Sequence, residues 1–382
     1  MSRASSDIQS IAVIGAGIIG LASALELADR GVRVTLYEKQ WPPRGASWAA
    51  AGMLAPAFEA AAAPGTHPRL FELCETSARL WPDWSAQLEV RSGQSAGYFP
   101  GPSLAIAQTA EQAALLRAVE AKLADHELAP QDCLSRLDEV EPAIETQARG
   151  ALLLPSDGQA DNRATLEALV ASAEAHDGIA IEKGEASIRV TSRGIDHSGH
   201  DATLITSGWR SAKVVLNQDE GASDVSGLDP VFDEIVAFGG QMLAVAPLED
   251  GPRLTVRCGH IYIVPKGDRI IIGATTEPGR TSLEPEHSTI ASLHQAAAEI
   301  CPALAKAEVI ESWAGIRPGT KDHAPILGET STPGLFVAAG HFRNGILLAP
   351  LTAKIMADLM IDQNSSELAR SFSPQSRYAE QL

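Results

Sequence analysis

The first forty residues place apolar runs around a glycine-containing turn. Residues 11–14 form a short apolar run that predicts a buried strand. Residues 18–30 put apolar side chains on one face of a predicted helix, and Gly31 is a natural stop for that helix. Residues 32–38 then alternate as a second strand that ends in Glu38. The pattern therefore predicts a strand–helix–strand unit, which is typical of α/β folds.

Later segments mix helical and strand periodicity. The expected elements are a helix at 163–176, a strand at 179–186, a β-meander at 187–207, a short buried strand at 214–216, antiparallel strands between 234 and 276, and a strand at 335–339. The polar turn 340–345 separates the last strand from an apolar helix. Pro350 limits where this helix can begin, because its ring clashes with the carbonyl of residue 346 unless that residue belongs to an irregular first turn.

The glycines of the first unit have the spacing of a nucleotide-binding turn. Gly15, Gly17 and Gly20 follow the pattern G-x-G-x-x-G. The first permits a tight turn, the second lets the backbone approach a pyrophosphate, and the third allows the helix to pack closely on the strand. Glu38, eighteen positions beyond Gly20, is placed to bind a ribose diol, and its charge disfavours the 2′-phosphate of NADP. These residues predict a dinucleotide site but do not separate FAD from NAD.

Composition excludes several classes of function. The chain has 382 residues, enough for two domains, and its 45% hydrophobic and 20% charged content is that of an ordinary globular enzyme. Its formal net charge of −18 would repel a phosphate backbone. We therefore expect no nucleic-acid partner.

The cysteines and the apolar stretches carry no further site. Cys74, Cys133, Cys258 and Cys301 lie far apart without a C-x-x-C pair, so neither a zinc site nor a disulfide framework is indicated, and we expect no metal. The glycine spacing in residues 11–25 argues against a signal peptide, and no other stretch approaches the length of a spanning helix. We expect a cytoplasmic protein without stable membrane insertion.

Three further segments carry a family resemblance. GASWAAAGMLAP at 45–56, taken alone, favours a small-residue helix packed against a sheet. Together with WAGIRPGTKDHAPILG at 313–328 and GHFRNGILLAP at 340–350, it resembles the D-amino-acid-oxidase-like flavoprotein family, and within it glycine oxidase of thiamine biosynthesis. The segments CGHIYIVP at 258–265 and IIIGATTEPG at 270–279 extend the resemblance.

The resemblance implies FAD as cofactor and an α/β fold of two domains. A discontinuous, Rossmann-type FAD-binding domain would comprise residues 1–85, 150–217 and 313–382. A second, substrate-binding domain built on an antiparallel sheet would comprise residues 86–149 and 218–312.

Candidate substrate-binding residues follow from the chemistry of an amino acid. Its carboxylate is a handle that the planar guanidinium of arginine binds bidentately. Arg317 is the leading candidate; from the residues alone a surface salt bridge fits equally well, whereas the resemblance implies the carboxylate-binding arginine. Tyr262 matches the tyrosine that helps to bind the carboxylate, with His260 in a supporting role. Arg343 would border the substrate pocket. These three, Arg317, Tyr262 and Arg343, are the expected catalytic residues.

The turn 340–345 is expected to meet the cofactor. Ligands of open α/β sheets bind at the carboxyl ends of strands, and the helix after this turn would direct its positive N-terminus at the flavin. His323 and His341 are interpreted as structural. The full set of expected cofactor-binding residues is Gly15, Gly17, Ile18, Ile19, Gly20, Glu38, Ser47, Ala51, Gly52, Met53, Ala186, Gly340, Asn344, Gly345 and Ile346.

One stretch departs from the family pattern. After the apolar residues 214–216 the family continues with a small glycine-containing turn, whereas this chain reads NQDEGASDVSG at 217–227. Asp219 and Glu220 beside a flavin phosphate would be repulsive. Either the turn points away from the cofactor or this part of the site is altered.

The hypothesis drawn from these features is oxidative deamination. Glycine or another small amine would be oxidised to an imine, and oxygen would reoxidise the flavin to give hydrogen peroxide, supplying thiazole synthesis for thiamine. One alternative is a D-amino-acid or imino-acid dehydrogenase that passes electrons to a quinone. A second is a non-catalytic FAD-containing subunit of a hetero-oligomer, and an NAD-dependent dehydrogenase ranks last. The sequence does not rank glycine, sarcosine, D-alanine and D-proline as substrates. The resemblance suggests a homo-oligomer.

Overall fold

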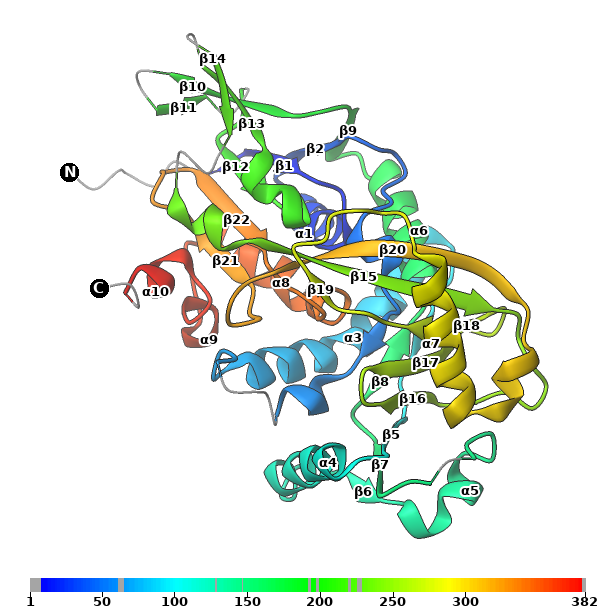
Figure 1. Cartoon of the computed structure of the whole chain (residues 1–382). Helices are drawn as coiled ribbons and strands as arrows, with labels where there is room; N and C mark the ends of the chain where they lie inside the picture. Colours follow the sequence, from blue (N-terminus) through cyan, green and yellow to red (C-terminus); the bar gives the residue numbers. More distant parts are fainter. Residues whose placement is uncertain are drawn as a thin grey trace.

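Two large β-sheets organise the chain, with helices packed around them (Figure 1). The computed structural model describes residues 8–60, 65–127, 129–145, 147–191, 194–196, 199–218, 221–224 and 229–379.

The first sheet has six strands in the order β21-β22-β12-β1-β2-β9, and it is parallel except for β21. Its expected core is confirmed: β1 (Ser10–Ile14), α1 (Ile18–Asp29) and β2 (Arg33–Glu38) follow one another along the chain. The other strands are β9 (Ile179–Lys183), β12 (Ala202–Ile205), β21 (Ile326–Glu329) and β22 (Leu335–Ala339). Segments from both ends of the chain thus complete one Rossmann-type sheet.

Four helices enclose the main apolar core beside this sheet. α1 packs against α6 (Asn162–Glu174) and α8 (Gly345–Met360), and α3 (Leu70–Ser92) packs against the same two helices. Side chains of α3 fix α8, because Ser77 Oγ and Trp81 Nε1 donate hydrogen bonds of 2.7 and 2.9 Å to the carbonyl oxygen of Leu347. α8 begins at Gly345, so residue 346, whose carbonyl Pro350 cannot bond, lies in its first turn.

The second sheet has nine strands, most of them antiparallel. The order is β19-β15-β18-β17-β16-β5-β7-β6, and β20 pairs with β15. These strands are β5 (Ser103–Ala107), β6 (Gln131–Asp132), β7 (Gly150–Leu154), β15 (Val236–Val245), β16 (Thr255–Cys258), β17 (Ile261–Pro265), β18 (Ile270–Gly273), β19 (Glu277–Pro278) and β20 (Val309–Gly319). The antiparallel strands expected between residues 234 and 276 are confirmed.

The two faces of the nine-stranded sheet have different neighbours. α7 (His287–Ile300) covers one face, against alternate residues such as Leu243, Ile263 and Ile272. The opposite face carries Met242 and Trp313, which pack against the small-residue segment around α2 (Ala46–Ala49). The remaining helices are α4 (Ala110–Lys122), α5 (Leu137–Val140), α9 (Glu367–Arg370) and α10 (Pro374–Ala379).

Two small sheets complete the fold, and one of them corrects the expected meander. The order β11-β10-β13-β14 joins β10 (Ser187–Thr191), β11 (Gly194–Asp196), β13 (Val215–Gln218) and β14 (Gly221–Asp224). β10 and β11 form the expected hairpin, but β12 leaves it and pairs in parallel with β1 and β22, so the meander across 187–207 was wrong. All four residues of β12 are buried, as in a central parallel strand. Asp219 and Glu220 of the acidic turn lie outside the described residues.

The second small sheet has the order β3-β8-β4, with β3 (Met53–Leu54), β8 (Gly158–Ala160) and β4 (Tyr98–Phe99). It lies between elements of the two large sheets, because β3 contacts α8 and Gln159 Nε2 of β8 donates to the carbonyl oxygen of Pro265 in β17 at 2.9 Å.

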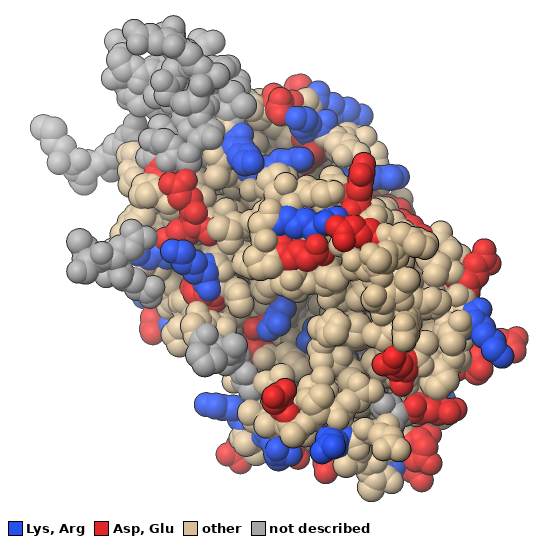
Figure 2. Space-filling model, viewed as in Figure 1, with Lys and Arg blue, Asp and Glu red and all other residues tan. Residues whose placement is uncertain are grey.

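The surface carries charges of both signs. On the face shown in Figure 2, Lys and Arg lie among Asp and Glu rather than gathering into one basic area. Within the described ranges, none of the helices combines the length and apolar character needed to cross a membrane. Nor does that part of the chain hold a cluster of three His, Cys, Asp or Glu side chains suited to a metal ion.

Candidate cofactor and substrate site

The glycine turn after β1 is too tightly packed for side chains at two of its three glycines. Gly15 has φ +105°, and a Cβ there would lie 2.8 Å from the Cα of Ser207. A Cβ on Gly20 would lie 1.8 Å from the carbonyl oxygen of Gly15. Gly17 precedes the first residue of α1, and no side chain caps the helix from that position. The turn is therefore pressed against the end of β12 and leaves the N-terminus of α1 facing outward.

Two side-chain oxygens accept hydrogen bonds from amides of this turn. Glu38 Oε2 accepts from the N–H of Ala16 at 2.8 Å, and Ser47 Oγ accepts from the N–H of Ile18 at 3.0 Å. These contacts place Glu38 and Ser47 at the N-terminus of α1. A dinucleotide phosphate at this terminus would meet the positive end of the α1 dipole.

The segment 45–53 lies across the junction of the sheets and is held by polar contacts of β8 and α6. Asn162 Nδ2 donates to the carbonyl oxygens of Ser47 and Trp48 at 2.8 and 2.9 Å. The N–H of Ala160 donates to the carbonyl oxygen of Gly52 at 2.8 Å. Gly52 has φ +74°, and a Cβ there would lie 2.0 Å from the carbonyl oxygen of Ala160. At Gly52 the backbone of this segment therefore packs directly against the backbone of β8.

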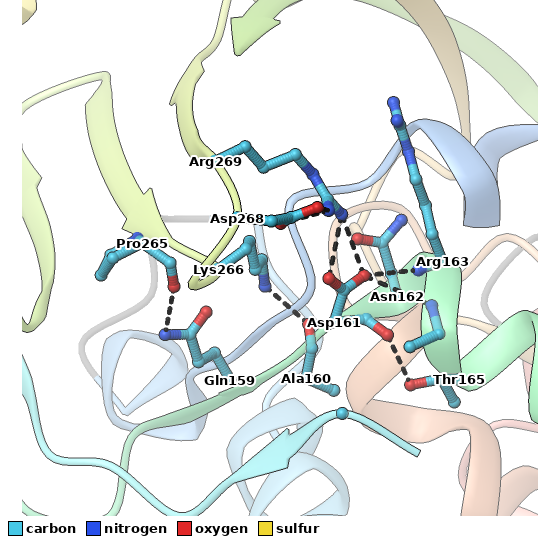
Figure 3. Close-up of polar contacts among 12 residues, drawn as sticks. Gln159, Ala160, Asp161, Asn162, Arg163, Thr165, Pro265, Lys266, Asp268 and Arg269 are labelled. Atoms are coloured by element: carbon cyan, nitrogen blue, oxygen red, sulfur yellow. Dashed lines mark hydrogen bonds and ion pairs between the residues drawn. The ribbon is translucent and has the colours of Figure 1, made fainter. Parts of the chain in front are cut away.

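A buried cationic cluster continues from β8 to the turn between β17 and β18 (Figure 3). Lys266 Nζ donates to the carbonyl oxygen of Ala160 at 2.7 Å, and Arg269 Nη2 binds both carboxylate oxygens of Asp161 at 3.0 Å. Burial lowers the pKa of Lys266 to about 7. These contacts fix the nine-stranded sheet to Ala160 and Asp161, at the end of β8. Sequence reasoning missed this contact.

The C-terminal turn approaches the same junction. Gly340 has φ +79°, and a Cβ there would lie 2.8 Å from Thr320 Cγ2. The N–H of Phe342 donates to the carbonyl oxygen of Pro318 at 2.6 Å. The two segments that carry the expected arginines therefore lie side by side.

The other expected cofactor-binding residues lie around these turns. Ile18 and Ile19 are buried in the first turns of α1, and Ala186 packs against the cluster that holds Ile14, at the end of β1. Asn344 and Gly345 begin α8, and α8 contacts both α1 and β3. The structure thus brings together the N-termini of α1 and α8 and the segment that holds Ala51, Gly52 and Met53.

Tyr262 and Arg317 lie on the face of the nine-stranded sheet that meets this segment. Tyr262, Gly273, Met242 and Trp313 stand in one line across β17, β18, β15 and β20, so their side chains leave the same face. Arg317 lies four residues beyond Trp313 on β20 and shares that face. Trp313 anchors this face of the sheet to the small-residue segment, because Trp313 Nε1 donates to the carbonyl oxygen of Ala49 at 2.9 Å.

Glycines on the neighbouring strands make room for both side chains. A Cβ on Gly273 would lie 2.5 Å from the phenol oxygen of Tyr262, and a Cβ on Gly240 would lie 2.4 Å from Arg317 Nη1. Arg317 Nη1 donates to the carbonyl oxygen of Thr275 at 3.1 Å. Among the described residues no carboxylate lies within 4.0 Å of the Arg317 guanidinium, so its charge has no ion-pair partner there. Burial raises the pKa of Tyr262, and Arg317 opposes this rise.

Arg343 is placed differently from the other two. Its side chain is 46% exposed, and its guanidinium forms an ion pair of 2.7 Å with Glu59, which is almost wholly buried. Asn344 Nδ2 donates to the same oxygen at 3.3 Å. Glu59, which sequence reasoning missed, therefore neutralises Arg343.

His341 and His260 differ in their surroundings. His341 is buried, its Nε2 lies 3.0 Å from Thr352 Oγ1, and burial lowers its pKa to about 3, so the ring is neutral at physiological pH. His260 is exposed and precedes β17. Arg257 was also missed by sequence reasoning: it lies directly opposite Tyr262 in the β16–β17 pair.

A Rossmann-type sheet with a glycine turn, an acid at the end of β2 and a second sheet facing that turn defines a dinucleotide-dependent oxidoreductase. The family model of FAD dependent oxidoreductases named DAO matches residues 10–359, and the chain belongs to this family. The family is one of FAD dependent oxidoreductases, and the cofactor is FAD.

Individual relatives agree with this assignment. Glycine oxidase of Geobacillus kaustophilus (strain HTA426) is 34% identical over 92% of both chains. The bifunctional protein ThiO/ThiG of Trichormus variabilis is 34% identical over 95% of this chain, which spans only 54% of that relative. The crystal structure of glycine oxidase from Geobacillus kaustophilus superposes with a TM-score of 0.82 at 32% identity, over 94% of this chain and 95% of that one. The structure of glycine oxidase from Bacillus cereus ATCC 14579 gives a TM-score of 0.80 at 29% identity, over 95% and 98%.

Proposed function

We propose that the chain oxidises glycine or another small amino acid or amine to the imine and uses oxygen as the electron acceptor. The substrate loses a hydride from Cα and a proton from nitrogen, and water then converts the imine to a carbonyl compound and ammonia or an amine. Oxygen takes up the two electrons with two protons and becomes hydrogen peroxide. When bound, FAD accepts the hydride and passes the electrons on.

The observation that carries this proposal is the pair Tyr262 and Arg317. Both project from the same sheet face toward the segment 45–53, and the guanidinium has no carboxylate partner among the described residues. Such a group binds a carboxylate through two parallel hydrogen bonds, while the phenol donates a third. Binding the carboxylate in this way would orient Cα toward the cofactor, and orientation is the main task left to the protein. Arg343 would border the pocket while paired with Glu59.

Several finer assignments belong to the same proposal. The likeness to glycine oxidases and to ThiO/ThiG proteins supports a role in thiazole formation for thiamine. A homo-oligomer is proposed from the family resemblance of the sequence alone. The four cysteines are buried and unpaired, which supports a reducing, cytoplasmic setting. We retain the proposed division into two parts. The FAD-binding part comprises residues 1–85, 150–217 and 313–382, and the substrate-binding part comprises residues 86–149 and 218–312. With this division, β7 and β20 extend from the FAD-binding part into the nine-stranded sheet of the substrate-binding part.

The test is an anaerobic spectrum of the purified flavoprotein. Glycine, sarcosine, D-alanine and D-proline are added in turn, and bleaching of the oxidised flavin band identifies the substrate. Air should restore the band with one peroxide formed per turnover. Bleaching that only a quinone or dye reverses would favour the dehydrogenase alternative, and a flavin that no amine bleaches would favour the non-catalytic subunit.

Arg317→Gln tests the carboxylate site. Loss of a bidentate, charge-assisted contact of about 3 kcal/mol lowers kcat/KM about a hundredfold. Arg253→Gln is the matched control. Arg253 lies just before β16 of the nine-stranded sheet, and its side chain is 68% exposed. Equal effects of the two substitutions would contradict the role assigned to Arg317.

A further inference from the structure

Arg257 occupies the same face of the nine-stranded sheet as Tyr262. The two residues stand directly opposite each other in the antiparallel pair β16–β17, so their side chains leave the sheet together. Arg257 Nε donates to Met53 Sδ at 3.4 Å, and its Cζ lies 4.6 Å from the centre of the Phe58 ring. The guanidinium is therefore held between Tyr262 and the segment that follows α2, beside the expected cofactor.

No acid of the described chain forms an ion pair with Arg257, and the charges of Asp157 and Glu59 act on it only from a longer distance. None of those carboxylates comes within 4.0 Å of its guanidinium. Glu59 is engaged by Arg343 and Asn344. Asp157 is fully buried, and burial raises its pKa to about 7, so it carries only part of a negative charge at neutral pH. A thioether is a weak acceptor for the single hydrogen bond that the guanidinium makes to a side chain.

Arg257 is half-buried, and a guanidinium that lacks an ion-pair partner in such a place is usually satisfied by an anion. On the same face of the sheet, the Arg317 guanidinium likewise has no carboxylate of the described residues within 4.0 Å. β16 and β20 are four steps apart in the sheet, about 19 Å at roughly 4.8 Å a step. Arg257 stands in line with Trp313, so Arg317 is also displaced from it by four residues along β20, about 13 Å. Arg317 turns inward over Gly240 of β15, which brings the two guanidinium groups toward each other across Tyr262. A ligand that touches both is longer than glycine.

We propose that Arg257 forms a second anion subsite beside the Arg317–Tyr262 carboxylate site, and that the preferred substrates are small amino acids with a second carboxylate. The inference rests on the proposed function, because it names the substrate class of that same site. One carboxylate binds Arg317 and Tyr262, and the other binds the terminal nitrogens of Arg257. Glu59 keeps Arg343 out of this arrangement by holding it in an ion pair.

The experiment measures binding without turnover. Succinate and butyrate have the same number of carbon atoms and differ by one carboxylate, and neither contains an amine to be oxidised. Each is titrated into the oxidised flavoprotein while the flavin absorbance is followed. Succinate should bind about tenfold more tightly than butyrate, as expected for one additional charge-assisted pair. In Arg257→Gln this ratio should fall to about one.

Two outcomes overturn the proposal. In the first, succinate binds no more tightly than butyrate to the unaltered protein. In the second, Arg257→Gln leaves the ratio at its original value. If the glutamine variant fails to hold flavin, Arg257→Lys decides: its ammonium cannot form the bidentate contact, so an unreduced preference for succinate in that variant also contradicts the proposal. The proposed function fails separately, when no amine bleaches the flavin, whatever the ratio of the two acids.

Discussion

Asp157 offers a measurable consequence of burying a carboxyl group at the junction of the two sheets. It lies between β7 and β8 with no exposed surface. Its Oδ1 accepts from the N–H of Ala57 at 3.1 Å, and its Oδ2 accepts from Ser103 Oγ at 3.5 Å. Asn at this position retains one acceptor of the same shape and never ionises. We therefore expect Asp157→Asn to gain stability over the wild-type protein as the pH rises.

The magnitude follows from the pKa of Asp157, which burial raises from 3.8 to about 7. Because the folded protein holds a proton that the unfolded chain releases, the wild-type free energy of unfolding falls as the pH rises between 3.8 and 7 and is constant above that range. At 1.36 kcal/mol per unit, the total loss is about 4 kcal/mol. About 2 kcal/mol of it falls between pH 5 and pH 7.

The assay is urea denaturation of the flavin-loaded proteins at pH 5, 6, 7 and 8, followed by circular dichroism. The free energy of unfolding of Asp157→Asn minus that of wild type should rise by about 2 kcal/mol from pH 5 to pH 7 and change little at pH 8. Asp83→Asn, at an exposed position of α3, controls for the loss of one negative charge. A difference that is independent of pH would refute the reasoning and show that Arg257 fully compensates the burial of Asp157.

Three further substitutions test the packing of the site. Gly20→Ala should abolish retention of FAD, since its Cβ would meet the Gly15 carbonyl oxygen at 1.8 Å; full flavin content in the purified variant would contradict this. Trp313→Phe removes the hydrogen bond to the Ala49 carbonyl and should lower the free energy of unfolding by about 1–3 kcal/mol in thermal or urea denaturation, unless water replaces the indole. Burial lowers the pKa of Lys266 from 10.5 to about 7, so burying this lysine costs the wild-type protein most stability below pH 7 and least above pH 10.5. The free energy of unfolding that Lys266→Met gains over wild type should therefore shrink by about 2 kcal/mol from pH 7 to pH 9. A gain that is constant over this range would argue against a neutral lysine.

Local patterns predicted the parts of the site that depend on backbone conformation. The spacing of Gly15 and Gly20 identified the turn, and the strand–turn–helix pattern around residues 335–346 identified the beginning of α8, because both are encoded by consecutive residues. The resemblance added Tyr262 and Arg317, and the structure places both on one sheet face.

Residues that act through long-range pairing were not accessible in this way. Arg257 is a single charge in an alternating strand, and only the register with Tyr262 shows where it points. The role of Glu59 depends on its ion pair with Arg343, which is 284 positions away along the chain. The strand at 202–205 was assigned to a meander because proximity along the chain outweighed its unbroken apolar character, which fits a strand buried on both faces.

The order of strands in the six-stranded sheet also constrains how the protein can be made. β22 lies between β12 and β21, yet more than a hundred residues separate it from β12 along the chain. During synthesis, β12 must remain an unpaired edge, and α1 must lack its contact with α8, until residues 326–360 have been produced. Exposed strand edges and apolar helix faces promote aggregation. Nascent chains that stall before β22 are therefore expected to require chaperones, and truncation before residue 326 should yield insoluble protein rather than a smaller flavoprotein.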